Sequence, residues 1–175
     1  AVLRSTFAAL RPFAATSRAS TSFPVRSGGR ISRALHRTGF QGWAAARWMD
    51  IALGAQWLLI NAPQGHESDL LNLMTLLHNQ GSDWESWFET FTGGAGGHNV
   101  NNAQALKSAA VWYLMTGNET LTQLSKSRME NLDRNYGLPT GMFNGDEILP
   151  NPATRFPSRG IELCGVVEAM FSYNT

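Results

Sequence analysis

The chain has 175 residues, of which 43% are hydrophobic and 15% are charged, and it contains six Trp and nine Phe. This length and composition are typical of a folded domain with a sizeable core, and they exclude a wholly disordered chain. No apolar run approaches the roughly 20 residues of a membrane-spanning helix, so we expect no membrane segment. The single cysteine excludes an internal disulfide and leaves the redox compartment open.

Charge divides the chain into two parts. Residues 1–49 contain eight Arg and no Lys, Asp or Glu, whereas residues 50–175 contain all 13 acidic residues and six Lys and Arg. The stretch 1–42 is rich in Arg, Ser and Ala and lacks acids, which is typical of a mitochondrial transit peptide; a disordered basic tail is the alternative. Its arginines are scattered and no aromatic platform accompanies them, so we expect no nucleic-acid partner. We therefore predict a basic leader or disordered segment over 1–42 and a folded domain over 43–175.

The first two predicted helices follow Trp43. Residues 66–80 have apolar side chains at helical spacing, with Ser68 or Asp69 as the expected cap. Residues 43–62 also show helical spacing and end at the segment Asn-Ala-Pro-Gln-Gly. The expected apolar positions are Trp48, Ile51, Leu53, Ala55, Trp57 and Leu58 in the first helix and Leu70, Leu73, Met74 and Leu77 in the second.

Further helices are predicted along the rest of the chain. A short aromatic helix follows the start signal Ser82–Asp83, and a long helix over 98–117 ends at Gly117. Another helix covers 118–137, and the last one begins near Gly160 or Ile161. No strand signal of similar strength appears, so the sequence predicts an all-α protein, either a helical toroid or a bundle.

One long loop, 137–160, contains four Pro and four Gly. Loops of this length are usually functional or disordered, so this is where we expect chemistry. The loop carries Asp146 and Glu147, adjacent carboxylates that suit general acid catalysis on a glycosidic oxygen. A solvated Asn-Gly-Asp turn is the alternative interpretation.

Two further places carry candidate site residues. His98 follows a glycine-rich loop and precedes Asn99, and this pair is suited to forming hydrogen bonds with hydroxyl groups. The alternative is that His98 and Asn99 only cap a helix. Glu162 and Cys164 can both bind zinc if the helix start is irregular. The alternative for this pair is a buried thiol beside a carboxylate favoured by the helix N-terminus.

Three segments together suggest a family. Residues 93–118, 137–150 and 160–173 resemble, in order and spacing, the beta-L-arabinofuranosidase-like family, glycoside hydrolase family 127. The resemblance extends over 43–175, is strongest from residue 93 onward, and is absent from 1–42. It implies part of an (α/α)6 barrel that acts on arabinofuranoside glycans with retention.

The resemblance also implies roles for single residues. Characterised members of the family use a cysteine nucleophile and a zinc ion held by a glutamate and three cysteines. The Glu-x-Cys ligand pair of the family matches Glu162 and Cys164, and a sugar-binding histidine matches His98. The acid/base glutamate of the family aligns near Gly141, so Glu147, or less favourably Asp146, is the substitute candidate.

The resemblance is incomplete, because the downstream nucleophile cysteine has no counterpart in a chain with one cysteine. We therefore expect a fragment that needs the rest of the barrel or an oligomeric partner and that has no arabinofuranosidase turnover by itself. A non-catalytic glycan-binding or structural remnant, or a mitochondrial protein of unrelated role, are the alternatives. The sequon Asn118-Glu119-Thr120 and the family favour secretion, whereas the basic segment favours mitochondria.

Overall fold

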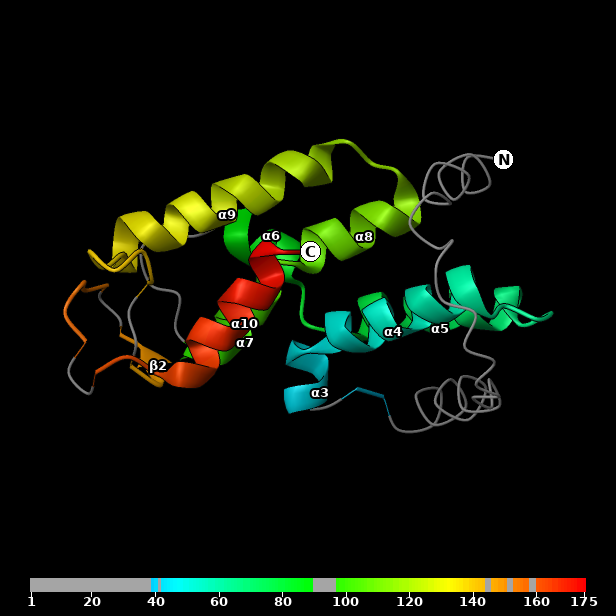
Figure 1. The fold of residues 1–175 in the computed structure, drawn as a ribbon, viewed down its shortest axis with the longest axis horizontal. Helices are drawn as coiled ribbons and strands as arrows, with labels where there is room; N and C mark the ends of the chain where they lie inside the picture. The colour runs from blue at the N-terminus through cyan, green and yellow to red at the C-terminus, as the bar shows by residue number, and fades with distance from the viewer. Residues whose placement is uncertain (1–38, 41, 90–96, 144–145, 151–152, 158–159) are drawn as a thin grey trace. The chain divides into compact units, whose positions relative to one another are not determined.

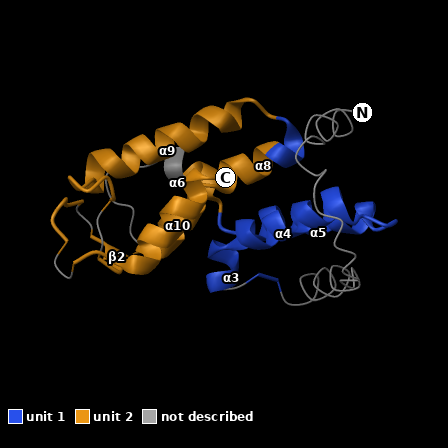
Figure 2. Ribbon diagram, viewed as in Figure 1, with its two compact units in different colours: residues 1–82, 114–117 blue, residues 83–113, 118–175 orange. Residues whose placement is uncertain are grey.

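The computed structural model describes residues 39–40, 42–89, 97–143, 146–150, 153–157 and 160–175, and these are mostly helical, as predicted (Figure 1). Nearly all of the basic segment 1–42 lies outside the described residues. The chain forms two compact units, 1–82 with 114–117 and 83–113 with 118–175 (Figure 2). No helix of the described part is long and apolar enough to cross a membrane, in agreement with the prediction.

The first unit is built on two helices that pack together, α4 (Trp48–Asn61) and α5 (Glu67–Gln80), preceded by the short α3 (Trp43–Ala46). All four residues predicted for the inner face of α5 are buried, and they meet a buried face of α4. The buried apolar residues are Trp48, Met49, Ala52 and Ala55 of α4 and Leu70, Leu73, Met74 and Leu77 of α5.

Trp48 fixes the geometry of this pair. Its indole N–H donates a hydrogen bond to the carbonyl oxygen of Ser82 at 3.2 Å, and its ring stands edge-on to His78 with centroids 5.2 Å apart. A Cβ at Gly81 would lie 2.1 Å from Trp48 Cδ1, so a residue without a side chain is required where the chain leaves α5.

Two expectations for this unit are wrong in detail. Neither Ser68 nor Asp69 is the cap of α5, because the helix already begins at Glu67 and His66 occupies the N-cap position. Asp69 instead lies in the first turn, where its carboxylate oxygen is 3.5 Å from Nδ1 of His66. On α4, two of the expected apolar positions are exposed, Trp57 at 58% and Ile51 at 37%, because the buried face of that helix passes through Ala52, Ala55 and Gln56.

The second unit contains α6 (Trp84–Glu89), which is capped as predicted: Oδ1 of Asp83 accepts from the backbone N–H of Ser86 at 3.0 Å. The long helix expected over 98–117 is two helices, α7 (Asn99–Ala105) and α8 (Ser108–Thr116). At the break between these two helices, side chains of α9 (Thr120–Tyr136) donate hydrogen bonds to backbone carbonyl groups.

Arg128 of α9 donates to the carbonyl oxygen of Ala105 at 3.4 Å, and Ser125 donates to that of Leu106 at 3.5 Å. The backbone N–H of Lys107 then bonds to the carbonyl of Gln104, three residues back, which is a tighter turn than an α-helix makes. As predicted, α8 ends at Gly117, whose φ of 67° is a left-handed conformation that favours glycine.

Two short strands were not predicted. β1 (Gly97–His98) and β2 (Ile148–Leu149) pair antiparallel, with Gly97 opposite Leu149 and His98 opposite Ile148. Each strand has two residues, which is too short for an alternating hydrophobic pattern to show. β2 lies inside the long loop 137–160, so part of that loop is tied to the start of α7.

The last helix, α10 (Leu163–Tyr173), begins two or three residues later than predicted and packs along α7. Its face toward α7 consists of small buried residues, Gly165, Ala169 and Ser172. Its outer face carries exposed apolar side chains, namely Leu163, Val167, Met170 and Phe171. Small residues on the buried face allow the two helices to approach closely.

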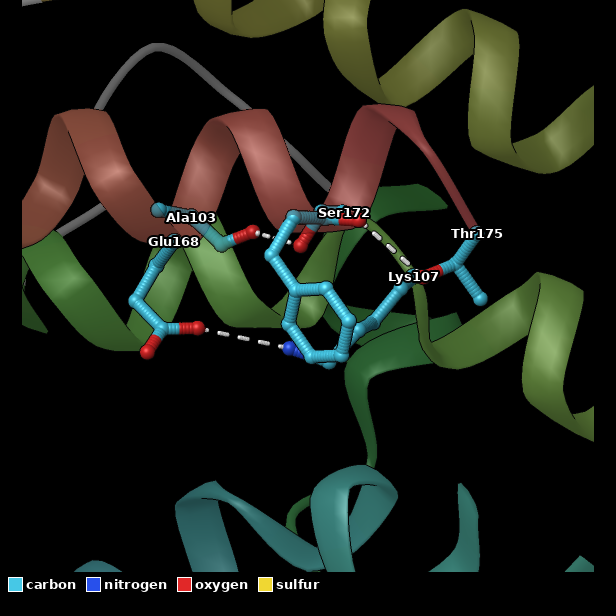
Figure 3. Close-up of polar contacts among 6 residues, drawn as sticks. Ala103, Lys107, Glu168, Ser172 and Thr175 are labelled. Carbon is cyan, nitrogen blue, oxygen red and sulfur yellow. Dashed lines mark hydrogen bonds and ion pairs between the residues drawn. The ribbon is translucent and has the colours of Figure 1, made fainter. Parts of the chain in front are cut away.

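Polar contacts join α10 to the end of α7 (Figure 3). Ser172 donates a hydrogen bond to the carbonyl oxygen of Ala103 at 2.7 Å. The fully buried Lys107 places its ammonium group 3.5 Å from a carboxylate oxygen of Glu168 and 4.6 Å from the ring centre of Phe171. Lys107 and Glu168 therefore form a charge pair that is partly desolvated.

Candidate functional site

The strand pair brings two predicted site residues together. β1 and β2 place His98 opposite Ile148, and the backbone N–H of Asn99 donates to the carbonyl oxygen of Glu147 at 2.8 Å. As a result Nε2 of His98 lies 3.6 Å from Oε1 of Glu147. This is ion-pair distance, slightly longer than a hydrogen bond.

His98 also caps α7, which orients its ring. Its Nδ1 accepts a hydrogen bond from the backbone N–H of Val100 at 3.3 Å. In the neutral imidazole a nitrogen that accepts carries no proton, so the proton is on Nε2, which faces Glu147. The His98 side chain is 16% exposed and that of Glu147 is 60% exposed, so the carboxylate is open to a ligand from solvent.

Asn99 is fully buried, and its side-chain amide lacks the hydrogen bonds that such a group normally makes. Neither Oδ1 nor Nδ2 of Asn99 has a hydrogen-bond partner among the described residues. Oε2 of Glu162 is also buried without a partner in that part of the chain. Such groups are costly, because they lose their bonds to water and gain none in return.

Gly165 packs closely against these two side chains. A Cβ at Gly165 would be 2.7 Å from Nδ2 of Asn99 and 3.7 Å from Oε2 of Glu162. The α7–α10 packing therefore brings the buried amide and the carboxylate to the same point on α10. Glu162 occupies the N-cap position of α10, where the helix dipole favours its negative charge.

Asn102, one turn after Asn99, extends this polar region. It is 1% exposed, and its Nδ2 donates to the carbonyl oxygen of His98 at 3.0 Å. Its Oδ1 has no hydrogen-bond partner among the described residues. The buried face at the start of α7 therefore carries polar side chains, and it packs against the small residues of α10.

The remaining predicted site residues are placed as follows. Asp146 is partly buried next to Glu147, and Cys164 is exposed. The alternative of a buried thiol at Cys164 is therefore wrong, because this side chain is exposed in the first turn of α10. The carboxylate at the helix N-terminus, the other half of that alternative, agrees with the position of Glu162.

The described residues fit zinc only in part. Glu162 and Cys164 are suitable ligand types, but within the described ranges no three His, Cys, Asp or Glu side chains come together. A structural zinc site needs four ligands, so the described residues offer two of them at most. We assign no chemical step to zinc.

Two residues of the site were not singled out by sequence reasoning. Gly165 follows Cys164 inside a helix, where glycine is unfavourable, and this is a signal of close packing that the sequence does contain. The signal that points to Asn102 is the unusual run of asparagines at a helix start.

The predicted sequon also has a structural role. Oδ1 of Asn118 accepts from the backbone N–H of Thr120 at 3.2 Å and from its hydroxyl at 2.9 Å. Asn118 is exposed, and these bonds satisfy a donor at the start of α9.

Comparison of the chain with protein-family models, with curated proteins and with solved structures finds no match.

Proposed function

We propose that residues 43–175 form part of a glycoside-hydrolase-like helical domain of the beta-L-arabinofuranosidase type, with His98 and Glu147 at its glycan-binding face and the buried Asn99 next to His98. The observation that carries the proposal is the 3.6 Å approach of His98 Nε2 to Glu147 Oε1. A histidine and an accessible carboxylate at one edge suit both the recognition of hydroxyl groups and proton transfer to a glycosidic oxygen. The proposed architecture is a segment of an (α/α)6 barrel.

Glu147 is the proposed acid/base residue, because its side chain is exposed to an incoming ligand and lies 3.6 Å from Nε2 of His98. The backbone bond from Asn99 to the carbonyl of Glu147 holds this carboxylate near the start of α7. Asp146 is the less favourable candidate, because its side chain is partly buried whereas that of Glu147 is open to solvent. As the acid, Glu147 would enter the step in its protonated form, and its proton would go to the leaving-group oxygen of the glycan.

The proposal includes zinc only through the residues that would bind it. Glu162 and Cys164 would be two of its ligands, and the other ligands would come from outside the described residues. When bound, zinc would supply Lewis acidity and keep a coordinating thiol deprotonated. Metal analysis of the purified chain and of Cys164→Ser checks this part independently of sugar binding.

Titration calorimetry with methyl beta-L-arabinofuranoside tests the proposal. We expect weak binding by the unmodified chain and at least tenfold weaker binding by His98→Ala, because the variant loses a hydrogen-bonding group at the glycan. Glu130→Gln, on an exposed face of α9, is the matched control for Glu147→Gln and should leave binding unchanged. Absence of sugar binding by the folded, unmodified chain would contradict the proposal.

A glycan-binding domain without catalysis is the second candidate, favoured by the single cysteine of this sequence, which leaves no second thiol for the nucleophile that the resemblance implies. Under this alternative Glu147→Gln binds the sugar with unchanged affinity. If Glu147 is a general acid that also hydrogen-bonds to the sugar, the same variant binds the sugar more weakly. Hydrolysis of a chromogenic arabinofuranoside by the purified chain would exclude this second candidate.

A further inference from the structure

The connection between α8 and α9 carries a motif that the proposed function does not use. Asn118-Glu119-Thr120 fits the acceptor pattern Asn-x-Ser/Thr for N-linked glycans, and no other tripeptide of the 175-residue sequence fits it. A bulky glycan needs an acceptor at the surface. All three residues are exposed, whereas the next residue, Leu121, is buried. The whole motif is therefore accessible from solvent in the folded chain.

The side chain of Asn118 is held through its oxygen atom. Oδ1 accepts hydrogen bonds from the backbone N–H of Thr120 at 3.2 Å and from the Thr120 hydroxyl at 2.9 Å. The backbone carbonyl of Asn118 accepts from the N–H of Leu121 at 3.1 Å. Asn118 therefore caps the first turn of α9, and none of these three bonds uses Nδ2.

We propose that Asn118 is an acceptor for an N-linked oligosaccharide when the chain passes through the secretory pathway. The donor is an oligosaccharide linked through a diphosphate to a polyprenol, and an oligosaccharide transferase of that pathway catalyses the step. Nδ2 of Asn118 forms a bond to the anomeric carbon of the donor. The bond from that carbon to the diphosphate oxygen breaks, and its electron pair leaves with the diphosphate. One proton of the amide goes to a base of the transferase.

The fold accepts this modification because the reacting atom and the capping atom are different. After the transfer the amide of residue 118 still has its carbonyl oxygen, so both bonds from Thr120 are retained. Gly117, with a φ of 67°, turns the chain out of α8 directly before the acceptor. The inference uses neither His98 nor Glu147, so it stands or fails independently of the proposed function.

The test expresses the full chain behind a cleavable secretory signal, by translation in the presence of endoplasmic reticulum microsomes. Chains protected from added protease are compared by mass before and after treatment with peptide N-glycosidase. We expect a single glycan on the unmodified chain, and its removal should leave an aspartate at position 118. Protected, unmodified chains without a glycan would overturn the proposal.

Matched variants locate the acceptor. Asn118→Asp keeps a capping oxygen but lacks the amide nitrogen, so it should carry no glycan. Thr120→Val lacks the hydroxyl of the motif and should also carry none, whereas Thr120→Ser keeps the hydroxyl and should keep the glycan. A glycan on Asn118→Asp would contradict the assignment. These measurements decide even if a variant is unstable, because the glycan is detected on translocated chains whether or not they fold.

Urea unfolding of chains secreted by a eukaryotic culture tests whether the glycan and the cap coexist. The glycosylated chain should unfold at no lower urea concentration than the enzyme-treated chain, because residue 118 has a capping oxygen in both. Asn118→Ala should unfold at a lower urea concentration, because the cap of α9 is lost. A glycosylated chain that unfolds as early as Asn118→Ala would show that the glycan displaces the cap, which would contradict the proposed geometry.

Discussion

The helix pair α4–α5 and the helix pair α7–α10 are held together in opposite ways. The first buries large apolar side chains, with Trp48, Met74 and Leu77 at 1% exposure or less. The second buries small residues of α10 against asparagines and a lysine of α7 and the turn that follows it. Burial of apolar side chains stabilises the folded state without requiring a specific contact geometry. A buried polar group stabilises it only if the group forms a hydrogen bond or an ion pair. The α4–α5 pair therefore serves stability, and the α7–α10 pair is where specific contacts are made.

The largest expected effect comes from a substitution in the apolar contact between α4 and α5. Leu77→Ala should lower the free energy of unfolding by about 2–5 kcal/mol, because the fully buried side chain leaves a cavity in α4–α5. Urea unfolding followed by tryptophan fluorescence measures this change. Asn72→Ala, on the exposed side of α5, is the matched control and should change stability by less than about 0.5 kcal/mol. A loss below about 1 kcal/mol in Leu77→Ala would show that α4–α5 is not a packed core.

The next effect tests the polar pair of α7–α10. Glu168→Gln should cost about 1–3 kcal/mol of stability, because it leaves the buried Lys107 without the carboxylate 3.5 Å away. Lys107→Met should cost less, because the remaining carboxylate of Glu168 is partly exposed to water. Urea unfolding of both variants checks the order. The reverse order would mean that the carboxylate, not the ammonium, depends on the pair.

The smallest effect concerns pH at the end of α10. Burial raises the pKa of Tyr173 above its usual value of 10.0, and the negative charge of Asp133 adds to this. The neutral phenol is therefore favoured in the folded state. The stability that Tyr173 contributes is fully present below the pKa of its phenol in the unfolded state, and it is lost as the pH rises through the pKa in the folded state.

Unfolding experiments from about pH 8 to about pH 11 should show a decline in stability that is smaller in Tyr173→Phe. Ultraviolet titration of Asp133→Asn should show the phenol ionising at a lower pH than in the unmodified chain. A titration unchanged by Asp133→Asn would remove the charge contribution and leave burial as the only cause.

The fold was predictable where the signal is local. The inner face of α5 and the stop of α8 at Gly117 follow from periodicity and from glycine, and both are confirmed. The break between α7 and α8 was not predictable, because its carbonyl groups are taken by Arg128 and Ser125 from another helix. The individual site residues His98, Asn99, Glu147 and Glu162 were singled out from their residue types, but not their grouping.

The sequence by itself determined the division of charge, the helical character of the folded part and the residue types suited to a glycan site. These properties depend on composition and on contacts between residues near in the chain. Only the tertiary structure decided that His98 meets Glu147 and that the side chains of Asn99 and Glu162 pack beside Gly165. The reason is physical: a two-residue ladder and a close contact of small residues join segments far apart in the chain, and neither leaves a periodic pattern in the sequence.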